Sequence, residues 1–314
     1  MKVTLVATVL NEAGNIRPFL EAILAQTRAA DEIVVTDGGS TDGTLEILRE
    51  QVRSGGPLRL LVEPGANIAR GRNLAIGQAS SEIIAVTDAG CRVDRKWLEE
   101  ITAPFCNPAV DVSGGVSRTE ATTLTQLSFG VLTLTDHGEA KARWFDPSSR
   151  CVAFRKSAWE KAGGYPEELD CAEDSLFNQR LHASGARFVF SPDALVYWLP
   201  PRSLREAAWK FYLYGRGDGR AGLSQNLYAR ILLKAVLATG LAAAALYSSF
   251  FLALLALSCV AYYLRTLWVN RKRGSLAVNS LVFLHRVSLD AARLAGFLLG
   301  RVERAVIPKF RHLR

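Results

Sequence analysis

Acidic residues stand within two positions of the ends of three apolar runs in the first ninety residues of the chain. They are Glu12 after 3–10, Asp37 after 33–35 and Asp88 after 82–87. In an open α/β sheet, ligands bind beyond the carboxyl ends of the strands, so carboxylates in these positions are suited to contact a nucleotide or a cation. The alternative is a set of solvated turns, with Thr41 or Asp42 capping the helix that follows the second run.

Two arginines and two further acids open later helices. Arg70 and Arg72 stand near the start of a helix predicted from residue 67, where a guanidinium and the helix dipole favour a diphosphate. Glu173 and Asp174 open a helix that continues through His182. One of these two carboxylates is suited to act as a general base over a bound acceptor. The alternatives are solvated arginines and acids that only complement the helix dipole.

The elements that must position these residues follow from the hydrophobic pattern. Short β-branched runs predict buried strands, and longer amphipathic stretches predict helices between them. The predicted strands cover 3–10, 33–35, 58–62, 82–87 and 151–155, and the predicted helices cover 16–26 and 45–53 and begin again at 67, 97 and 173. Two strands joined by one helix form a nucleotide-binding type of βαβ unit. With 314 residues, one large or two modest domains are expected.

The last third of the chain has a different composition. Residues 235–264 carry no charge, and the segment from 265 onward holds eleven Lys or Arg against two acidic residues, which accounts for the net charge of +8. A basic tail that follows an apolar run is better suited to anionic lipid headgroups than to nucleic acid. The five cysteines are widely spaced, and a strand pattern begins directly after Met1 without a signal peptide. We therefore expect free thiols and a cytosolic catalytic part.

The uncharged segment is long for a single membrane span. As one helix it would measure about 45 Å, whereas the hydrocarbon layer is roughly 30 Å thick. A hairpin broken near Tyr247–Ser249 keeps the basic tail in the cytosol and agrees with the positive-inside rule. One tilted span and a buried soluble helix pair are the alternatives. Residues 276–299 mix apolar and charged positions, which favours a helix lying in the membrane interface.

The order of these motifs resembles the family 2 glycosyltransferases of the GT-A fold. The resemblance covers about residues 2–220 and rests on VTDGGSTDGT, ARGRN, VTDAGC, GGYPE and AEDSLFNQRL in this order. It implies a mixed sheet flanked by helices, a nucleotide-diphosphate sugar donor and, in most members, inversion at the anomeric carbon. Residue by residue, it implies that Glu12 and Asp37 hold the nucleoside, that Arg72 lies near the diphosphate, that Asp88 begins the metal motif, and that Asp174, next to Glu173, is the catalytic base.

The chain departs from the family pattern in its metal motif. The family's D-x-D appears as Asp88-Ala89-Gly90, and a position that often holds a histidine ligand is Trp198. A magnesium or manganese ion bound at Asp88 would then depend on phosphate oxygens and water. The Q-x-x-R-W motif of processive relatives is not found, and residues 209–218 are expected to form a helix and a loop in which Arg216 contacts phosphate. Transfer of a single sugar is therefore favoured.

The sequence thus predicts a GT-A catalytic domain at 1–228, a transmembrane hairpin or tilted span at 229–269, and a basic amphipathic tail at 270–314. Its expected function is transfer of one sugar from a nucleotide-diphosphate sugar to an acceptor hydroxyl or phosphate, lipid-linked where the acceptor lies in the membrane, with no nucleic-acid partner. Specificity is expected to lie in residues 119–150. The alternatives are a non-catalytic sugar-nucleotide-binding or scaffold protein of envelope polysaccharide assembly, and a nucleotidyltransferase.

Overall fold

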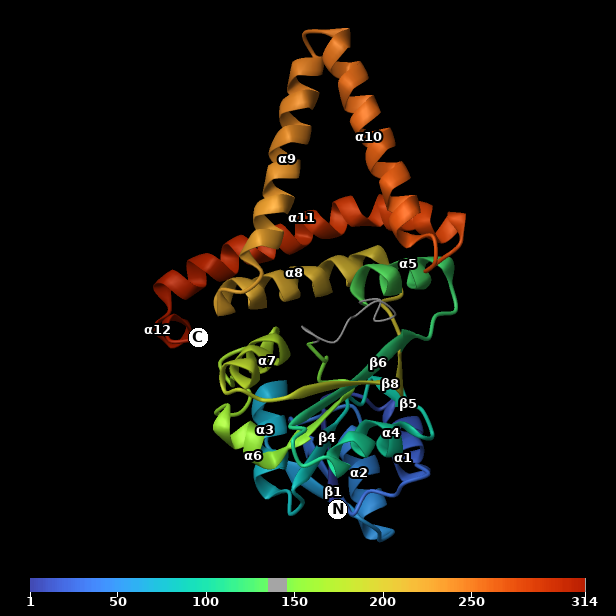
Figure 1. Cartoon of the computed structure of the whole chain (residues 1–314), viewed down its shortest axis with the longest axis vertical. Helices are drawn as coiled ribbons and strands as arrows, with labels where there is room; N and C mark the ends of the chain where they lie inside the picture. The colour runs from blue at the N-terminus through green and yellow to red at the C-terminus, as the bar shows by residue number, and fades with distance from the viewer. Residues whose placement is uncertain (135–145, 314) are drawn as a thin grey trace. The chain divides into compact units, whose positions relative to one another are not determined.

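The computed structural model describes residues 1–134 and 146–313, which form two compact units (Figure 1). Within the described residues, the first unit consists of 1–120 and 146–199, and the second consists of 121–134 and 200–313. Residues 135–145, which belong to the segment expected to set specificity, lie outside the described residues. The two units are described separately below.

A mixed sheet forms the centre of the first unit. Within the described residues it has eight strands in the order β3-β2-β1-β4-β7-β6-β8-β5, of which the first four are parallel and β7 is antiparallel to both of its neighbours. The strands are β1 (Val3–Val9), β2 (Glu32–Asp37), β3 (Leu58–Val62), β4 (Ile83–Val86), β5 (Cys91–Val93), β6 (Val112–Thr119), β7 (Val152–Arg155) and β8 (Phe188–Trp198). Every residue of β2 is buried, as expected for a parallel strand covered on both faces.

Helices cover this sheet and connect its parallel strands. They are α1 (Ile16–Leu24), α2 (Thr44–Arg53), α3 (Ile68–Gln78), α4 (Trp97–Thr102), the 3-10 helix η1 (Ala103–Cys106), α6 (Lys156–Lys161) and α7 (Glu173–Ala183). A hydrophobic core joins the sheet to α3 and α7, with Val34, Ile76, Phe154 and Phe177 among its buried members. The predicted alternation of strand and helix through the first ninety residues is confirmed.

The strand register brings the predicted carboxylates to one edge of the sheet. Val9 at the end of β1 is paired with Asp37 at the end of β2, and Val6 of β1 is paired with Val86, the last residue of β4. Because these strands are parallel, the loops after β1, β2 and β4 all leave the sheet on the same side. Glu12, Asp37 and Asp88 are therefore carried by neighbouring loops.

The second unit is helical. Its helices are α5 (Leu124–Thr133), α8 (Leu204–Ala221), α9 (Gln225–Ala245), α10 (Ser249–Asn270), α11 (Leu276–Val306) and α12 (Pro308–Arg311). In the described part of the chain, α9 and α10 are the two helices long and apolar enough to cross a membrane, and only 11% and 6% of their most apolar windows are buried. They pack against each other and are joined by the short turn 246–248 (Figure 1).

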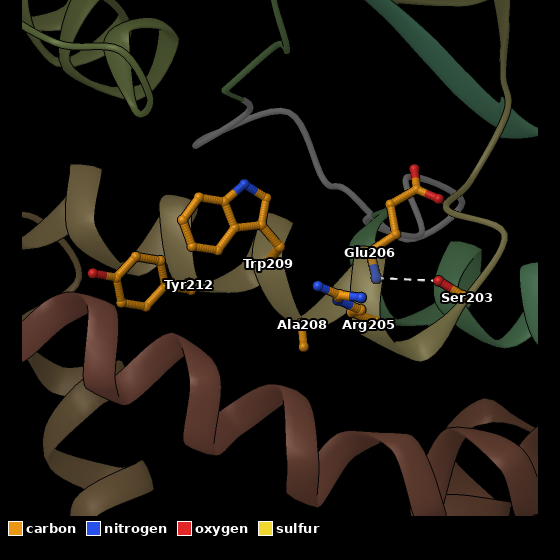
Figure 2. A pocket seen from close by; sticks show the side chains of 6 residues that line it. All are labelled: Ser203, Arg205, Glu206, Ala208, Trp209 and Tyr212. Carbon is orange, nitrogen blue, oxygen red and sulfur yellow. Dashed lines mark hydrogen bonds between the residues drawn. The ribbon is translucent and has the colours of Figure 1, made fainter.

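Helices α8 and α11 pack side by side in parallel at close range. Gly215 and Gly219 of α8 face Gly296 and Gly300 of α11, and a Cβ added at Gly300 would lie 2.2 Å from the backbone oxygen of Arg216. Small residues at such a contact let two helix backbones approach closely. The loop expected within residues 209–218 is wrong: all of these residues belong to α8, and Gly215 takes part in this helix contact. Figure 2 shows the first half of this helix, which lines an open hollow.

Candidate active site

The loops after β1 and β2 are held together by hydrogen bonds. The backbone N–H of Asn11 donates to the Ser40 hydroxyl, and the Asn11 side-chain oxygen accepts from the backbone N–H of Thr41, both at 2.9 Å. The backbone N–H of Ala13 donates to the Asp42 carboxylate at 3.0 Å. Asp42 also accepts hydrogen bonds from the backbone N–H and the hydroxyl of Thr44, the first residue of α2, while the N-cap position itself is held by Gly43.

Asp37 is completely buried at the end of β2. Its Oδ1 atom accepts hydrogen bonds from the backbone N–H groups of Gly39 and Ser40, both at 2.9 Å. Its Oδ2 atom has no hydrogen-bond partner within the described residues. A buried, unpartnered carboxylate oxygen is destabilising, and a ligand that donates a hydrogen bond removes this penalty. Half of the hydrogen-bonding capacity of this carboxylate is therefore unused within the described residues.

Glu12 approaches the loop that follows β4. Its Oε2 atom accepts a hydrogen bond of 2.8 Å from the side chain of Asn15. Its Oε1 atom would lie 3.8 Å from a Cβ added at Gly90. The Glu12 carboxylate thus faces the space that a side chain at residue 90 would enter.

Arg72 joins two carboxylates from different parts of the first unit. Its guanidinium donates to Asp88 at 2.6 Å and to Glu173 at 2.8 Å, and only 2% of its side chain is exposed. The Tyr165 ring lies 5.3 Å from the guanidinium carbon. Burial opposes the charge of Arg72, but the charges of Asp88 and Glu173 outweigh it and raise the pKa of this guanidinium. Arg72 therefore carries a permanent positive charge.

The helix α3 approaches the sheet closely at Gly71, next to Arg72. A Cβ added at Gly71 would lie 2.8 Å from the Thr8 methyl group, and the Thr36 hydroxyl donates to the Gly71 carbonyl at 2.9 Å. The N-cap residue Asn67 accepts from the backbone N–H of Arg70 and donates to the Leu169 carbonyl. The start of α3 is thereby fixed both to the sheet and to the segment that precedes α7.

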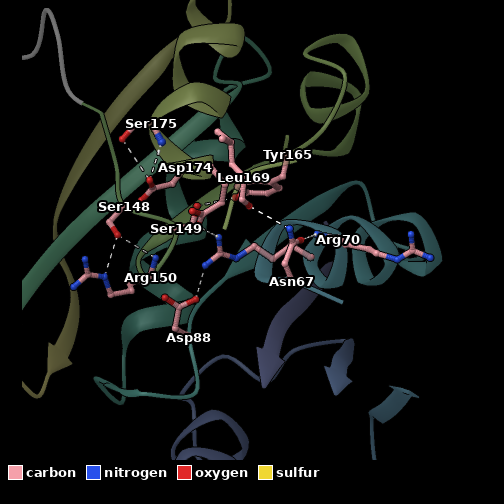
Figure 3. Close-up of polar contacts among 12 residues, drawn as sticks. Asn67, Arg70, Asp88, Ser148, Ser149, Arg150, Tyr165, Leu169, Asp174 and Ser175 are labelled. Atoms are coloured by element: carbon pink, nitrogen blue, oxygen red, sulfur yellow. Dashed lines mark hydrogen bonds and ion pairs between the residues drawn. The ribbon is translucent and has the colours of Figure 1, made fainter. Parts of the chain in front are cut away.

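Glu173 and Asp174 form the first turn of α7, but their environments differ. Glu173 is buried, and this burial together with the Asp174 charge raises its pKa, while the Arg72 guanidinium opposes the rise. Asp174 is partly exposed and accepts a hydrogen bond of 2.7 Å from the backbone N–H of Ser175 (Figure 3). Ala172, just before them, has a φ of 66°, a left-handed conformation that costs about 1–2 kcal/mol for a residue other than glycine.

One basic residue near this site had no motif to indicate it. Arg150 precedes β7 and donates to the Ser148 hydroxyl at 3.1 Å (Figure 3). Its guanidinium carbon lies 5.1 Å from the centre of the Trp198 ring. Trp198 is the position where a histidine ligand was considered, and it is buried as the last residue of β8. The only signal for Arg150 in the sequence is its charge, just before the predicted strand 151–155. Charged residues next to strands are common, so this signal does not single it out.

Arg216 lies in the second unit, on α8. Its guanidinium donates to Glu303 of α11, which also accepts a hydrogen bond of 2.6 Å from Arg220. The other predicted residues, Glu12, Asp37, Arg72, Asp88, Glu173 and Asp174, all belong to the first unit. Among the described residues, no group of three or more His, Cys, Asp or Glu side chains is placed to hold a metal ion.

Known proteins of similar sequence match about two thirds of this chain. The chain is 29% identical to the glycosyltransferase AglE of Haloferax volcanii over 223 residues, which cover 69% of this chain and 72% of AglE. It is 27% identical to the succinoglycan biosynthesis protein ExoA of Rhizobium meliloti over 226 residues, which cover 67% of each chain.

Solved structures of similar fold include the mannosyltransferase PcManGT of Pyrobaculum calidifontis, determined with GDP-Man and Mn²⁺. The TM-score is 0.61 at 21% identity, and the match covers 98% of this chain and 88% of that one. The predicted GT-A type of sheet, flanked by helices, is confirmed. The family model for glycosyl transferase family 2 matches residues 4–161, and the chain belongs to this family of sugar-transferring enzymes.

Proposed function

We propose that this enzyme transfers a single sugar, with inversion, from a nucleotide-diphosphate sugar to an acceptor hydroxyl or phosphate at the cytosolic face of a membrane. The unpartnered, buried Oδ2 atom of Asp37 is the observation that carries the proposal. It lies at the sheet edge where nucleotides bind in open α/β folds, and an N–H group of the base is the donor that it lacks. Glu12, on the adjoining loop, then contacts the nucleoside or its diphosphate.

A divalent cation fits this site with fewer protein ligands than a complete D-x-D motif would provide. Asp88 and Glu12 are the carboxylates that would hold it, because Gly90 leaves open the space in front of the Glu12 Oε1 atom. Phosphate oxygens and water would complete the coordination, as is usual for magnesium. When bound, such a cation stabilises the negative charge that develops on the departing diphosphate. The Arg150 guanidinium, beside Trp198, is a second positive group that would interact with the negative charge of the departing diphosphate.

Asp174 is the proposed general base. Its partly exposed carboxylate takes the proton of the acceptor hydroxyl while the acceptor oxygen bonds to the anomeric carbon, and the bond between that carbon and the diphosphate breaks with its electron pair leaving on the diphosphate. Glu173 is buried against Arg72 and is a positioning residue. Through Arg72, it fixes the first turn of α7 relative to Asp88.

The membrane location rests on the second unit. We propose that α9 and α10 cross the bilayer as a hairpin, which places the basic segment after residue 270 on the cytosolic side with the catalytic unit. Anionic headgroups then attract this segment. An acceptor that is itself lipid-linked would lie at the same surface.

The first test is calorimetric titration of the full chain, in lipid nanodiscs, with UDP, GDP and TDP, with and without Mn²⁺. We expect one of the three diphosphates to bind. We expect Asp37→Asn to weaken its binding at least tenfold, because the amide replaces one acceptor with a donor that faces the base N–H. Asp193→Asn, at an exposed position of β8, is the matched control and should bind normally. Binding of no diphosphate, or equal binding by both variants, would refute the donor site.

A further inference from the structure

We propose that Arg150, held in place by Trp198, binds the second phosphate of the donor directly and retains the diphosphate even when no metal ion is bound. This proposal rests on the glycosyltransferase function proposed above and deepens it, because it makes diphosphate binding partly independent of the cation at Asp88. Trp198 stands where the family pattern often has a histidine ligand, and an indole ring offers a donor and no lone pair to a cation. In this chain the ring holds a guanidinium instead.

The register of two strands places Arg150 near Asp88. Strands β4 and β7 are antiparallel, and Val86 at the end of β4 is paired with Val152 at the start of β7. Asp88 follows Val86 by two residues, and Arg150 precedes Val152 by two residues. The chain therefore leaves β4 toward Asp88 at the same edge of the sheet at which it enters β7 from Arg150.

A second pair of strands brings Trp198 to the same edge. Trp198, the last residue of β8, is paired with Cys91, the first residue of β5. The backbone N–H of Cys91 donates to the Asp88 carbonyl at 3.0 Å, so Trp198 lies beside the turn that carries Asp88. Burial and the Asp88 charge raise the pKa of the Cys91 thiol, and the Arg150 guanidinium opposes this rise. The charges of Asp88 and Arg150 thus both act on the same sulfur atom.

The Arg150 guanidinium is fixed in its position by two contacts. Its carbon atom lies 5.1 Å from the centre of the Trp198 ring, a distance at which a cation is attracted to an aromatic face. Its Nε atom donates to the Ser148 hydroxyl at 3.1 Å (Figure 3). Trp198 is itself buried, with 8% of its surface exposed, so the ring is a rigid support. A cation that is oriented before the ligand arrives loses little entropy on binding.

Arg150 is better suited to contact phosphate than Arg72 is. The Arg72 side chain is only 2% exposed, and its guanidinium is already paired with Asp88 and Glu173. A phosphate could reach it only by displacing a carboxylate, which leaves a buried charge unpaired. Arg150 is partly exposed, and a guanidinium matches two phosphate oxygens with two parallel hydrogen bonds. Direct contact with the diphosphate is therefore the role of Arg150, and Arg72 positions Asp88.

The test compares nucleoside diphosphates with the matching monophosphates in the presence of EDTA. Calorimetry is performed on the full chain in nanodiscs with UDP, GDP and TDP and with UMP, GMP and TMP. We expect one diphosphate to bind without metal, roughly tenfold more tightly than its monophosphate. Arg150→Gln should remove most of this preference and leave monophosphate binding unchanged, because only the second phosphate contacts Arg150. Arg150→Lys keeps the charge and should retain part of the preference.

Arg92→Gln is the matched control. The Arg92 guanidinium lies 4.2 Å from the ring of Tyr197, which precedes Trp198 on β8. Because successive side chains of a strand point to opposite faces of the sheet, this similar pair lies on the other face. Arg92→Gln should therefore keep the full preference for the diphosphate.

Trp198 is a positioning residue in this proposal, and its variants test that role. Trp198→Leu should reduce the preference for the diphosphate, and Trp198→Phe should retain much of it, since an aromatic face is kept. The double variant Arg150→Gln/Trp198→Leu should lose no more than Arg150→Gln does, because the ring acts through the guanidinium. Independent, additive losses in the double variant would contradict this role.

The outcomes separate this proposal from the donor site itself. If the diphosphate binds with Mn²⁺ but not in EDTA, the contact with Arg150 fails and the donor site stands. The same conclusion follows if wild type and Arg150→Gln show equal preferences for the diphosphate. Equal losses of monophosphate and diphosphate in Arg150→Gln would mean that this arginine only supports the fold, which also overturns the proposal. If no nucleotide binds with or without Mn²⁺, the donor site and the contact with Arg150 both fail.

Discussion

The Arg72 guanidinium donates a hydrogen bond of 2.8 Å to the Glu173 carboxylate, 101 residues further along the chain. The same guanidinium donates to Asp88 at 2.6 Å. One buried cation thereby connects the loop after β4 with the first turn of α7. These two segments carry the proposed cation ligand and the proposed base, so their relative position depends on Arg72.

Arg72→Lys should slow sugar transfer more than it weakens donor binding. A lysine keeps the positive charge but lacks the planar fork that reaches two carboxylates at once. A displacement of about 1 Å between reacting groups can cost roughly 10²-fold in rate, and we expect a loss of that order in kcat. The matched control is Arg70→Lys, because Arg70 pairs with Glu63 at an exposed position of the same helix. Equal rates for the two variants would contradict the positioning role of Arg72.

Asp174→Asn should abolish most of the transfer activity and leave the diphosphate affinity unchanged. The amide cannot take the acceptor proton, and general base catalysis contributes roughly 10²–10⁴-fold. Steady-state transfer to the acceptor, together with calorimetry of the nucleotide, separates the two effects. Asp170→Asn, in the segment just before α7, serves as the control. Full activity in Asp174→Asn would exclude this residue as the base.

We expect a carboxylate introduced at position 90 to replace the Glu12 carboxylate as a ligand of the proposed cation. Glu12→Gln should weaken Mn²⁺ binding, measured by electron paramagnetic resonance in the presence of the diphosphate, because it removes one of two carboxylates. Gly90→Asp should strengthen binding, since the new carboxylate enters the space in front of Glu12. The double variant should recover much of the affinity lost in Glu12→Gln. If Mn²⁺ affinity is the same in all four proteins, Glu12 has no part in holding the cation.

Glu303 should make the stability of the second unit dependent on pH. Hydrogen bonds from Arg216, opposed by burial and reinforced by Arg220, lower the pKa of this carboxyl from about 4.5 to about 2. Its stabilising contribution is therefore complete above pH 4.5 and is lost as the pH falls toward 2. Glu303→Gln should lower the free energy of unfolding at pH 7 by about 1.5–3 kcal/mol, as for hydrogen bonds to charged groups.

Thermal unfolding of the nanodisc-embedded protein at pH 7, 4.5 and 3 measures this contribution. Wild-type protein should lose stability between pH 4.5 and pH 3 more steeply than Glu303→Gln. Glu50→Gln is the control, because Glu50 pairs with Arg17 on the open surface of the first unit. Such exposed pairs contribute about 0–1 kcal/mol. Parallel pH profiles of wild type and Glu303→Gln would show that the carboxylate is not stabilised as described.

The hairpin predicts opposite sides of the membrane for two cysteines. Tyr247, 91% exposed in the turn between α9 and α10, can be replaced by cysteine, and Cys106 is a native exposed thiol of the catalytic unit. A membrane-impermeant maleimide should label Tyr247→Cys in intact cells and should label Cys106 only after permeabilisation. If both thiols are labelled in intact cells, or if neither is labelled until the cells are permeabilised, α9 and α10 do not cross the bilayer as a hairpin.

Sequence alone determined the parallel half of the sheet and the positions of its acidic loops. Strands that are buried on both faces require continuous apolar residues, so they can be recognised from the sequence. Two such runs precede Asp37 and Asp88, and both form buried strands. The break of the apolar segment near Tyr247 was also visible, since Ser248 and Ser249 interrupt the hydrophobic run and Ser248 caps α10.

Tertiary structure decided which charges meet. Arg72 is paired with Glu173 across a separation of 101 residues, and Arg216 is helical and paired with Glu303 instead of lying in a loop. The carboxylate that faces Gly90 comes from the loop after β1. Local sequence patterns report the burial and periodicity of a segment, but the partner of a long charged side chain depends on distant backbone that comes near only after the chain folds. For this reason the sequence identified the acidic loops, and the folded structure alone showed Arg72 between Asp88 and Glu173.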